Sequence, residues 1–357
     1  MIKKGWFYWL FFLALFAAPF YLTEFRLSLL GKFLCFAMIA IGISLLWGYT
    51  GILSLGHGVY FGLGAYCMAM YLKLESAPGR LPDFMEWSGV NKLPWFWKPF
   101  EHPLFAMSAA IIIPVLLAAF LSYFTFKNRI KGVYFSLLSQ AVVVVFVTLF
   151  IGKQEWTGGT NGLTNFSTVF GFSLSSPLTQ IVLYWITVCL LLLIFLFSRW
   201  LTVSRFGRVL VAIRDGENRV RFLGFNPTTY KVFVYSLSAA FAALAGVMFV
   251  LQVGLISPAM MGIIPSIEMV LWVAVGGRSS LIGAVIGAIV TNSAKSFFSE
   301  NYPDIWLLFL GGLFIGVVMF LPNGLAGIYE SLKQRKRHGE GRTHEAGSHV
   351  SRSVGGF

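Results

Sequence analysis

Charged residues are scarce in this chain: Asp, Glu, Lys and Arg make up 11% of its 357 residues, whereas 57% are hydrophobic. Soluble proteins usually carry about 25% charged residues, so these are too few to cover a water-exposed surface. The composition therefore excludes an ordinary soluble protein and indicates a chain that folds in a lipid bilayer. A bilayer core roughly 30 Å thick requires about 20 apolar residues per helix, and several segments meet that length.

Catalytic and nucleotide-binding motifs are also missing. The chain contains no GxxxxGK[ST] Walker loop, no paired-carboxylate motif, no metal-ligand spacing and no Gly-x-Ser-x-Gly elbow. Cys35, Cys67 and Cys189 fall inside apolar runs and are interpreted as small packing residues. The longest non-spanning stretches hold about 30 residues, too few for a folded catalytic module. We therefore expect no catalytic residue, metal or cofactor, and a membrane-embedded enzyme is the least favoured class.

Long apolar runs are abundant. They predict membrane helices near residues 6–23, 27–47, 51–72, 103–126, 132–151, 177–198, 231–254, 265–277, 279–297 and 305–321. The eighth run is too short to cross the bilayer as a helix, so it is either a half-helix or is extended by irregular backbone that protein covers. The predicted fold is an all-α polytopic membrane protein with about ten transmembrane helices, within a range of eight to ten.

Basic residues outnumber acidic ones, 27 to 14, and the formal net charge is +13. They lie between apolar runs and form no aromatic-interleaved stripe, so nucleic acid is not an expected partner. With the N-terminus inside, most of them fall in cytoplasmic segments, as the positive-inside rule requires. Lys3 and Lys4 ahead of an apolar run resemble a secretory signal, but the length of the run favours an uncleaved first helix. We expect a multi-pass protein of the plasma (inner) membrane with both termini in the cytoplasm.

The charge and hydropathy pattern predicts one transmembrane domain, residues 1–330, with two notable loops. The segment 73–102 is rich in Pro and Trp, which favours an ordered extracytoplasmic insert at the membrane interface. The segment 204–227 is a basic cytoplasmic loop. The tail 331–357 is rich in Gly, Ser, Arg and His without apolar periodicity, so we expect a disordered basic cytoplasmic tail.

The loop 204–227 has the pattern of a short amphipathic helix. Phe206, Val209, Leu210 and Ile213 follow the i, i+3, i+4, i+7 spacing, while charged side chains occupy the other faces. Gly216 permits a break, and Gly224 with Pro227 ends the element. Two interpretations remain open: a basic helix lying on anionic lipid, or a surface on which another protein docks.

The same loop resembles the ATPase-coupling loop of ABC importer permeases of the branched-chain amino acid and urea branch. The matching residues are Ala212-Ile-Arg-Asp215 and Leu223-Gly224, whereas the general Glu-Ala-Ala pattern of importers is incomplete. Three further segments match in family order: 48–58, 157–164 and 272–287. The resemblance covers roughly residues 25–325. Two features, the insert from Leu81-Pro-Asp-Phe-Met85 to Leu93-Pro-Trp-Phe-Trp97 and Asn161-Gly-Leu-Thr-Asn-Phe166, are more similar to the urea permease subunit.

The resemblance implies a permease that forms half of a translocation pathway for urea, or for short-chain amides or branched-chain amino acids. It implies four kinds of partner: a second homologous permease, cytoplasmic ATP-binding subunits that hydrolyse ATP, an extracytoplasmic substrate-binding protein and the lipid bilayer. The expected ATPase-coupling residues are Arg205, Phe206, Arg208, Val209, Leu210, Ala212, Ile213, Arg214, Asp215 and Gly224.

Polar residues in or near the apolar runs are candidates for the substrate pathway. They are His57, Thr157, Thr160, Asn161, Ser266, Glu268 and Asn292. Glu268 needs a partner or water, since an ionised carboxylate at a helix centre costs about 3 kcal/mol. Glycines between Gly51 and Gly64 either permit close helix packing or leave room for a solute. An ion-coupled secondary transporter is the alternative function, although such carriers commonly hold more intramembrane ionisable groups.

Overall fold

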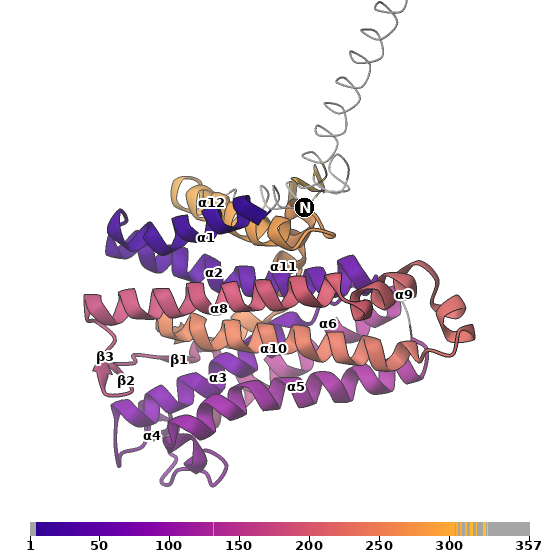
Figure 1. Cartoon of the computed structure of the whole chain (residues 1–357). Coiled ribbons are helices and arrows are strands. Elements are labelled where there is room, and N and C mark those ends of the chain that lie inside the picture. Colours follow the sequence, from indigo (N-terminus) through magenta and orange to yellow (C-terminus); the bar gives the residue numbers. More distant parts are fainter. Residues whose placement is uncertain are drawn as a thin grey trace, which may run out of the picture.

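The computed structural model describes residues 5–130 and 132–303, and scattered positions between 305 and 327. Most of the predicted span 305–321 and the whole predicted tail 331–357 lie outside the described residues, as do Lys3, Lys4 and Lys131. Figure 1 shows a bundle in which long helices run side by side between two ends. One end carries α9, and the other carries the short α4 and small strands.

The fold is a helical bundle with very little strand. Its helices are α1 (Gly5–Ala17), α2 (Glu24–Ser44), α3 (His57–Ser76), α4 (Asp83–Trp87), α5 (Pro103–Lys127), α6 (Val133–Gly152), α7 (Gln154–Thr157), α8 (Pro177–Val203), α9 (Arg205–Phe222), α10 (Pro227–Val253), α11 (Ile263–Gly276) and α12 (Leu281–Asn301). The strands are β1 (Leu163–Thr164), β2 (Thr168–Val169), β3 (Phe172–Ser173) and β4 (Leu255–Ile256). Short 3-10 turns connect several of them.

Six described helices are long and apolar enough to cross a membrane: α2 with its extension to Thr50, α5, α6, α8, α10 and α12. Two shorter apolar helices cover Tyr8–Phe20 and Ile263–Gly276. The prediction of a multi-pass helical protein is therefore confirmed, whereas the predicted count of ten spans is not. The helix α3, at 20 residues, is almost wholly buried inside the bundle.

Proline and capping residues set the helix starts. Pro103, Pro177 and Pro227 stand in the first turn of α5, α8 and α10, where a missing amide hydrogen costs nothing. The side chains of Ser204 and Ser280 accept hydrogen bonds from the first turns of α9 and α12. These signals fix where the long helices begin.

Glycines bring the central helices into close contact. The helix α10 packs against α3, α5 and α2. A side chain at Gly64 would meet the backbone of Ala243, and one at Gly246 would meet the carbonyl of Phe61. In the α11–α12 hairpin, Gly287 similarly contacts the backbone of Trp272. At these positions the glycines allow close packing of helices, and they do not leave room for a solute.

Two interruptions break the helical pattern. The end of α2 continues as a π-helical turn, Leu45–Thr50, and residues 51–56 are not helical. The predicted span 51–72 is therefore wrong at its start, because α3 begins at His57. A second irregular stretch, residues 254–262, separates α10 from α11. The 14 residues of α11 extend about 21 Å. Near 265–277 the structure therefore has a short helix with irregular backbone before it, which combines the two alternatives predicted for this segment.

The insert 73–102 is an ordered cap. Lys73 at the end of α3 forms an ion pair of 3.0 Å with Asp83 of α4. Trp97 donates a hydrogen bond of 3.2 Å to the carbonyl of Trp156, whose ring also contacts Phe96. The strands β1 and β4 pair antiparallel at the same end. These contacts tie the segment to the bundle, and its interpretation as an ordered extracytoplasmic insert stays a prediction.

Candidate transport pathway and coupling helix

The helix α9 lies across the end of the bundle between α8 and α10 (Figure 1). Its apolar side faces inward: Leu210 is 0% and Ile213 is 3% exposed. Phe206 packs on Tyr230 and Phe233 of α10 with ring centroids 5.1 and 5.3 Å apart. The amphipathic helix predicted from spacing is present, but its apolar face packs on its own bundle and does not form an exposed ridge for a partner.

The outer side of α9 is basic in its first half and apolar at its tip. Arg205, Arg208 and Ala212 are exposed, and Val209 is half-buried. Phe222 at the end of the helix is 91% exposed and Leu223 is 76% exposed. Gly224 has a positive φ of 86° and ends the helix, as its position suggested. Phe222 and Leu223 lie beyond the residues whose apolar spacing predicted the first half of the helix. Their exposure was therefore not predicted from the sequence.

A kink at Gly216 divides α9, with φ −171° and ψ 73° at that residue. Directly after it, the carboxylate of Glu217 accepts hydrogen bonds from Arg221 at 2.9 Å and from the buried Lys231 of α10 at 2.8 Å. This ion cluster holds the second half of α9 against the start of α10. Both halves of the helix are therefore attached to the bundle at defined points.

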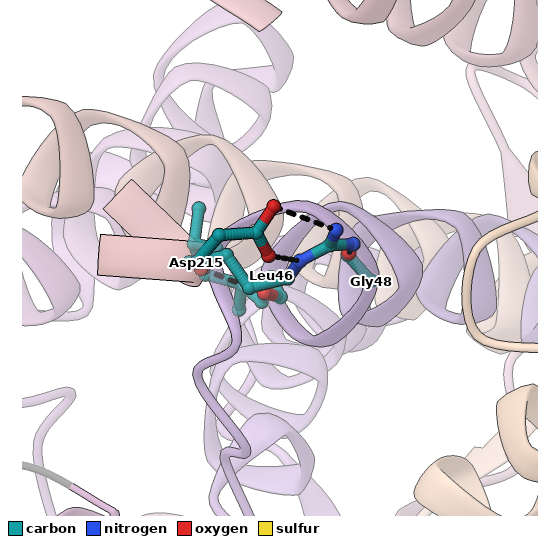
Figure 2. A network of polar contacts seen from close by, with 5 residues as sticks. Leu46, Gly48 and Asp215 are labelled. Carbon is teal, nitrogen blue, oxygen red and sulfur yellow. Dashed lines mark hydrogen bonds and ion pairs between the residues drawn. The ribbon is translucent and has the colours of Figure 1, made fainter. Parts of the chain in front are cut away.

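Arg214 joins α9 to the end of α2. Its Nη1 donates a hydrogen bond of 2.7 Å to the carbonyl oxygen of Gly48, and its Nε and Nη2 face the two carboxylate oxygens of Asp215 at 2.8 and 3.4 Å. Figure 2 shows Asp215 beside the turn that carries Leu46 and Gly48. The hydrogen bond from Arg214 lowers the pKa of Asp215, so this carboxylate is ionised at neutral pH.

A cavity of about 360 Å³ opens beside this contact. It is lined by the end of α2, the first residues after it, α9 and the start of α10, including Thr50, Gly51, Arg214, Asp215, Glu217 and Lys231. Its charged lining distinguishes it from a lipid-facing groove. The end of α2 and the kink of α9 therefore face the same polar cavity.

A buried polar network surrounds His57 at the start of α3. The His57 Nε2 lies 2.7 Å from the Ser238 hydroxyl, while the hydroxyls of Tyr60 and Ser54 lie 3.0 and 3.3 Å from that of Tyr235. The Nδ1 of His57 and the hydroxyl of the neighbouring Ser266 have no hydrogen-bond partner within the part of the chain that the structure describes. The network links α3 to α10, so the His57 side chain joins two helices of the bundle.

Glu268 and Asn292 line a second pocket, of about 350 Å³, between α2, α11 and α12. Both carboxylate oxygens of Glu268 accept hydrogen bonds from Lys295, at 2.7 and 2.8 Å. Lys32 and the aromatic side chains of Phe36, Phe249 and Trp272 also line this pocket. The partner that Glu268 requires is therefore Lys295. Its position three residues beyond Asn292 in an apolar helix was the available signal in the sequence.

The remaining candidates lie at the insert end. Thr157 is buried and donates to the carbonyls of Phe150 and Lys153, at 2.5 and 2.8 Å, so its hydroxyl stabilises the end of α6. Thr160 and Asn161 are exposed in the adjoining turn. The predicted pathway residues thus fall into three places. These are the His57 network, the Glu268 pocket and the insert end, and Ser266 lies beside Gly58 at the His57 network.

Comparison with known proteins identifies the family. The sequence profile described as branched-chain amino acid transport system / permease component matches residues 25–318. The high-affinity branched-chain amino acid transport system permease protein LivM of Salmonella typhimurium is 25% identical over 332 residues, covering 87% of this chain and 72% of LivM. The corresponding permease protein BraD of Pseudomonas aeruginosa is 24% identical over 307 residues, covering 82% of this chain and 91% of BraD.

A more distant match is the autoinducer 2 import system permease protein LsrC of Yersinia pestis, 29% identical over 177 residues that cover 46% of this chain and 48% of LsrC. No solved structure matches. LivM and BraD, which match over most of this chain, are transport subunits and not enzymes, and this agrees with the multi-pass helical bundle. The chain belongs to the family of permease components of branched-chain amino acid transport systems.

Proposed function

We propose that this chain is a permease subunit of an ABC importer in the inner membrane, with both termini in the cytoplasm. It forms half of the translocation pathway with a second homologous permease. Separate cytoplasmic ATPases hydrolyse ATP and act on the chain through α9, and an extracytoplasmic binding protein delivers the substrate to the insert end. The observation that carries the proposal is the rigid attachment of α9 across one end of the bundle.

The packing of α9 favours docking of a protein over binding to lipid. A helix that lies on a membrane buries its apolar face in the headgroup region. In this chain the apolar face is already occupied, since Leu210 and Ile213 are buried against the bundle. The exposed surface consists of basic side chains and the apolar tip at Phe222 and Leu223, a combination that another protein can bind.

Urea is the proposed substrate, with short-chain amides next. The proposal rests on the similarity of the insert and of residues 161–166 to the urea permease subunit. In the structure Trp97 of the insert donates to the carbonyl of Trp156, which lies five residues before the second region, and residues 163–164 of that region pair with β4. A neutral solute rich in donors and acceptors needs paired hydrogen-bonding groups, which Glu268, Lys295 and Asn292 offer in the second pocket.

Branched-chain amino acids are the second candidate substrate. The names of LivM and BraD favour them, and so does the lining of the second pocket. Lys32, Lys295 and Glu268 supply both signs of charge for a zwitterion, and Phe36, Phe249 and Trp272 supply an apolar surface. The ion-coupled secondary transporter is not favoured, because the matched family consists of permease components of transport systems.

Uptake of labelled urea by cells with and without the intact chain tests the substrate. We expect urea uptake to fall when the chain is removed, whereas leucine uptake persists. Loss of leucine uptake with urea uptake intact would replace urea by branched-chain amino acids. In the same assay, Glu268→Gln is expected to reduce uptake at matched membrane abundance, and unchanged uptake would remove Glu268 from the pathway.

A further inference from the structure

The last turn of α2 is wound differently from the rest of the helix. Residues Leu45–Thr50 form a π-helical turn, and Gly51 follows in the left-handed region with φ 73°. The Thr50 hydroxyl donates to the carbonyl of Leu46 at 2.6 Å, and the amide of Ile52 reaches the same carbonyl at 3.3 Å. π-Helical turns are rare in proteins, and those that occur are often found at functional sites. The winding leaves the Gly48 carbonyl directed toward α9.

The contact from α9 is fixed in direction. Asp215 holds the guanidinium of Arg214 on one side, and the remaining Nη1 donates to Gly48. The stem of Arg214 covers Gly51, where an added Cβ would lie 3.0 Å from the Arg214 Cγ. A planar guanidinium held by a carboxylate in this way transmits position better than a flexible lysine would.

On its other side, the same turn contacts the loop between α11 and α12. The Ser44 hydroxyl donates to the carbonyl of Arg278 at 3.1 Å, and Gly48 packs directly on that carbonyl. The guanidinium of Arg278 lies 5.8 Å from the ring centroid of Trp47. This loop follows α11, which carries Glu268, and precedes α12, which carries Lys295. Movement of the turn therefore bears on the hairpin that lines the second pocket.

The non-helical residues after the turn are held by side chains of neighbouring helices. Ser136 donates to the carbonyl of Leu53 at 2.7 Å, and the amide of Leu55 donates to Ser139 at 3.0 Å. Irregular backbone at membrane depth is tolerated only where protein or water satisfies it, and it rearranges more easily than a helix. The hydrogen bonds of segment 45–56 can therefore be exchanged for others when it moves, and the cavity beside Arg214 lies next to the segment.

We propose that segment 45–56 is a movable inner gate of the permease and that Arg214 is the positioning residue that links it to α9. A shift of α9 pulls on the Gly48 carbonyl, changes the course of residues 51–56 ahead of α3, and displaces the loop at Arg278. The inference rests on the proposed function, because it requires an ATPase to move α9. Removing the link should leave ATP hydrolysis in place while separating it from transport.

The test uses the complete transporter in proteoliposomes, supplied with ATP and with labelled urea or labelled leucine. The quantity measured is solute taken up per ATP hydrolysed. For Arg214→Ala we expect this ratio to fall about tenfold, because a charge-assisted hydrogen bond is lost, while ATPase association and hydrolysis remain within about twofold of wild type. Arg214→Lys keeps the charge without the oriented fork and should give an intermediate ratio.

Arg26→Ala is the matched control, since this exposed arginine stands at the opposite end of α2. An unchanged ratio in Arg214→Ala overturns the inference. Loss of ATPase association also overturns it, because Arg214 would then belong to the docking surface. If the Arg214→Ala chain does not fold and cannot be recovered from the membrane, Asp215→Asn is measured, and a wild-type ratio there overturns the inference. Failure of the wild-type complex to transport either solute contradicts the proposed function instead.

Discussion

The ion pair of Glu268 and Lys295 joins α11 to α12 within the membrane-spanning bundle. The Glu268 side chain is 7% exposed and that of Lys295 is 33% exposed, so the carboxylate depends more on its partner. Replacing one member of a buried pair leaves an uncompensated charge, whereas replacing both does not. The pair therefore has a predictable effect on stability, apart from any role in transport.

For Lys295→Met we expect a loss of about 3 kcal/mol in unfolding free energy, because the Glu268 carboxylate loses the ammonium that both of its oxygens contact. The double variant Glu268→Gln/Lys295→Met should recover most of this loss. Denaturant or thermal unfolding of the purified chain in detergent measures both. Equal stability of the single and double variants would show that the unpaired Glu268 carboxylate is not the cause of the loss.

The anchor of the insert is expected to depend on pH. The hydrogen bond from Lys73 lowers the pKa of Asp83 below its usual value. A carboxylate whose folded pKa is depressed stabilises the fold above the unfolded pKa, about 3.9, and this contribution is lost as the pH falls through the lower folded value. The anchor should therefore be intact at neutral pH and weaken only in strong acid.

Asp83→Asn removes the carboxylate's charge while keeping its shape. At pH 7 we expect faster hydrogen exchange in residues 77–102 of this variant than in the wild type, with the difference shrinking as the pH falls through the lowered pKa of Asp83. Exchange measured by mass spectrometry on peptides from the insert checks both parts. Equal exchange at pH 7 would show that the Lys73 contact does not hold the insert.

At the scale of elements, the tip of α9 offers the clearest exposed apolar surface next to basic side chains. Phe222→Asp should reduce co-purification of the ATPase about tenfold or more, since exposed aromatic anchors contribute much of the energy of an interface. Phe172→Asp is the control: it alters another exposed Phe, 68% exposed in β3 at the opposite end of the bundle. Equal ATPase recovery from the two variants would exclude the tip from docking.

The sequence predicted the long helices well, because apolar runs and the prolines at 103, 177 and 227 mark them directly. It also predicted the short α11 from its length. It did not predict that residues 51–56 leave the helix, since their apolar composition suits a helix and only long-range contacts from Ser136, Ser139 and Tyr235 hold them otherwise.

The candidate site was predicted in part for the same reason. The spacing of Phe206, Leu210 and Ile213 identified an amphipathic helix, but periodicity alone does not say whether an apolar face meets a partner or its own bundle. Likewise, Glu268 stood out as an acid in an apolar run, whereas its partner Lys295 is 27 residues away and becomes visible only when α11 folds back on α12.

At the scale of the whole molecule, the bundle has two chemically different ends joined by long helices (Figure 1). One end presents α9, the Arg214 contact and a polar cavity; the other presents the ordered insert and the paired strands β1 and β4. The sequence contains no GxxxxGK[ST] Walker loop. In our account it works only as one subunit of a larger complex.

Uptake into proteoliposomes, compared between the chain alone and the complete complex, tests the central claim most directly. We expect the complex to accumulate labelled urea or leucine only when ATP is supplied, and the chain alone to accumulate neither solute under an imposed proton or sodium gradient. Accumulation by the chain alone under such a gradient, without ATP, would contradict the account.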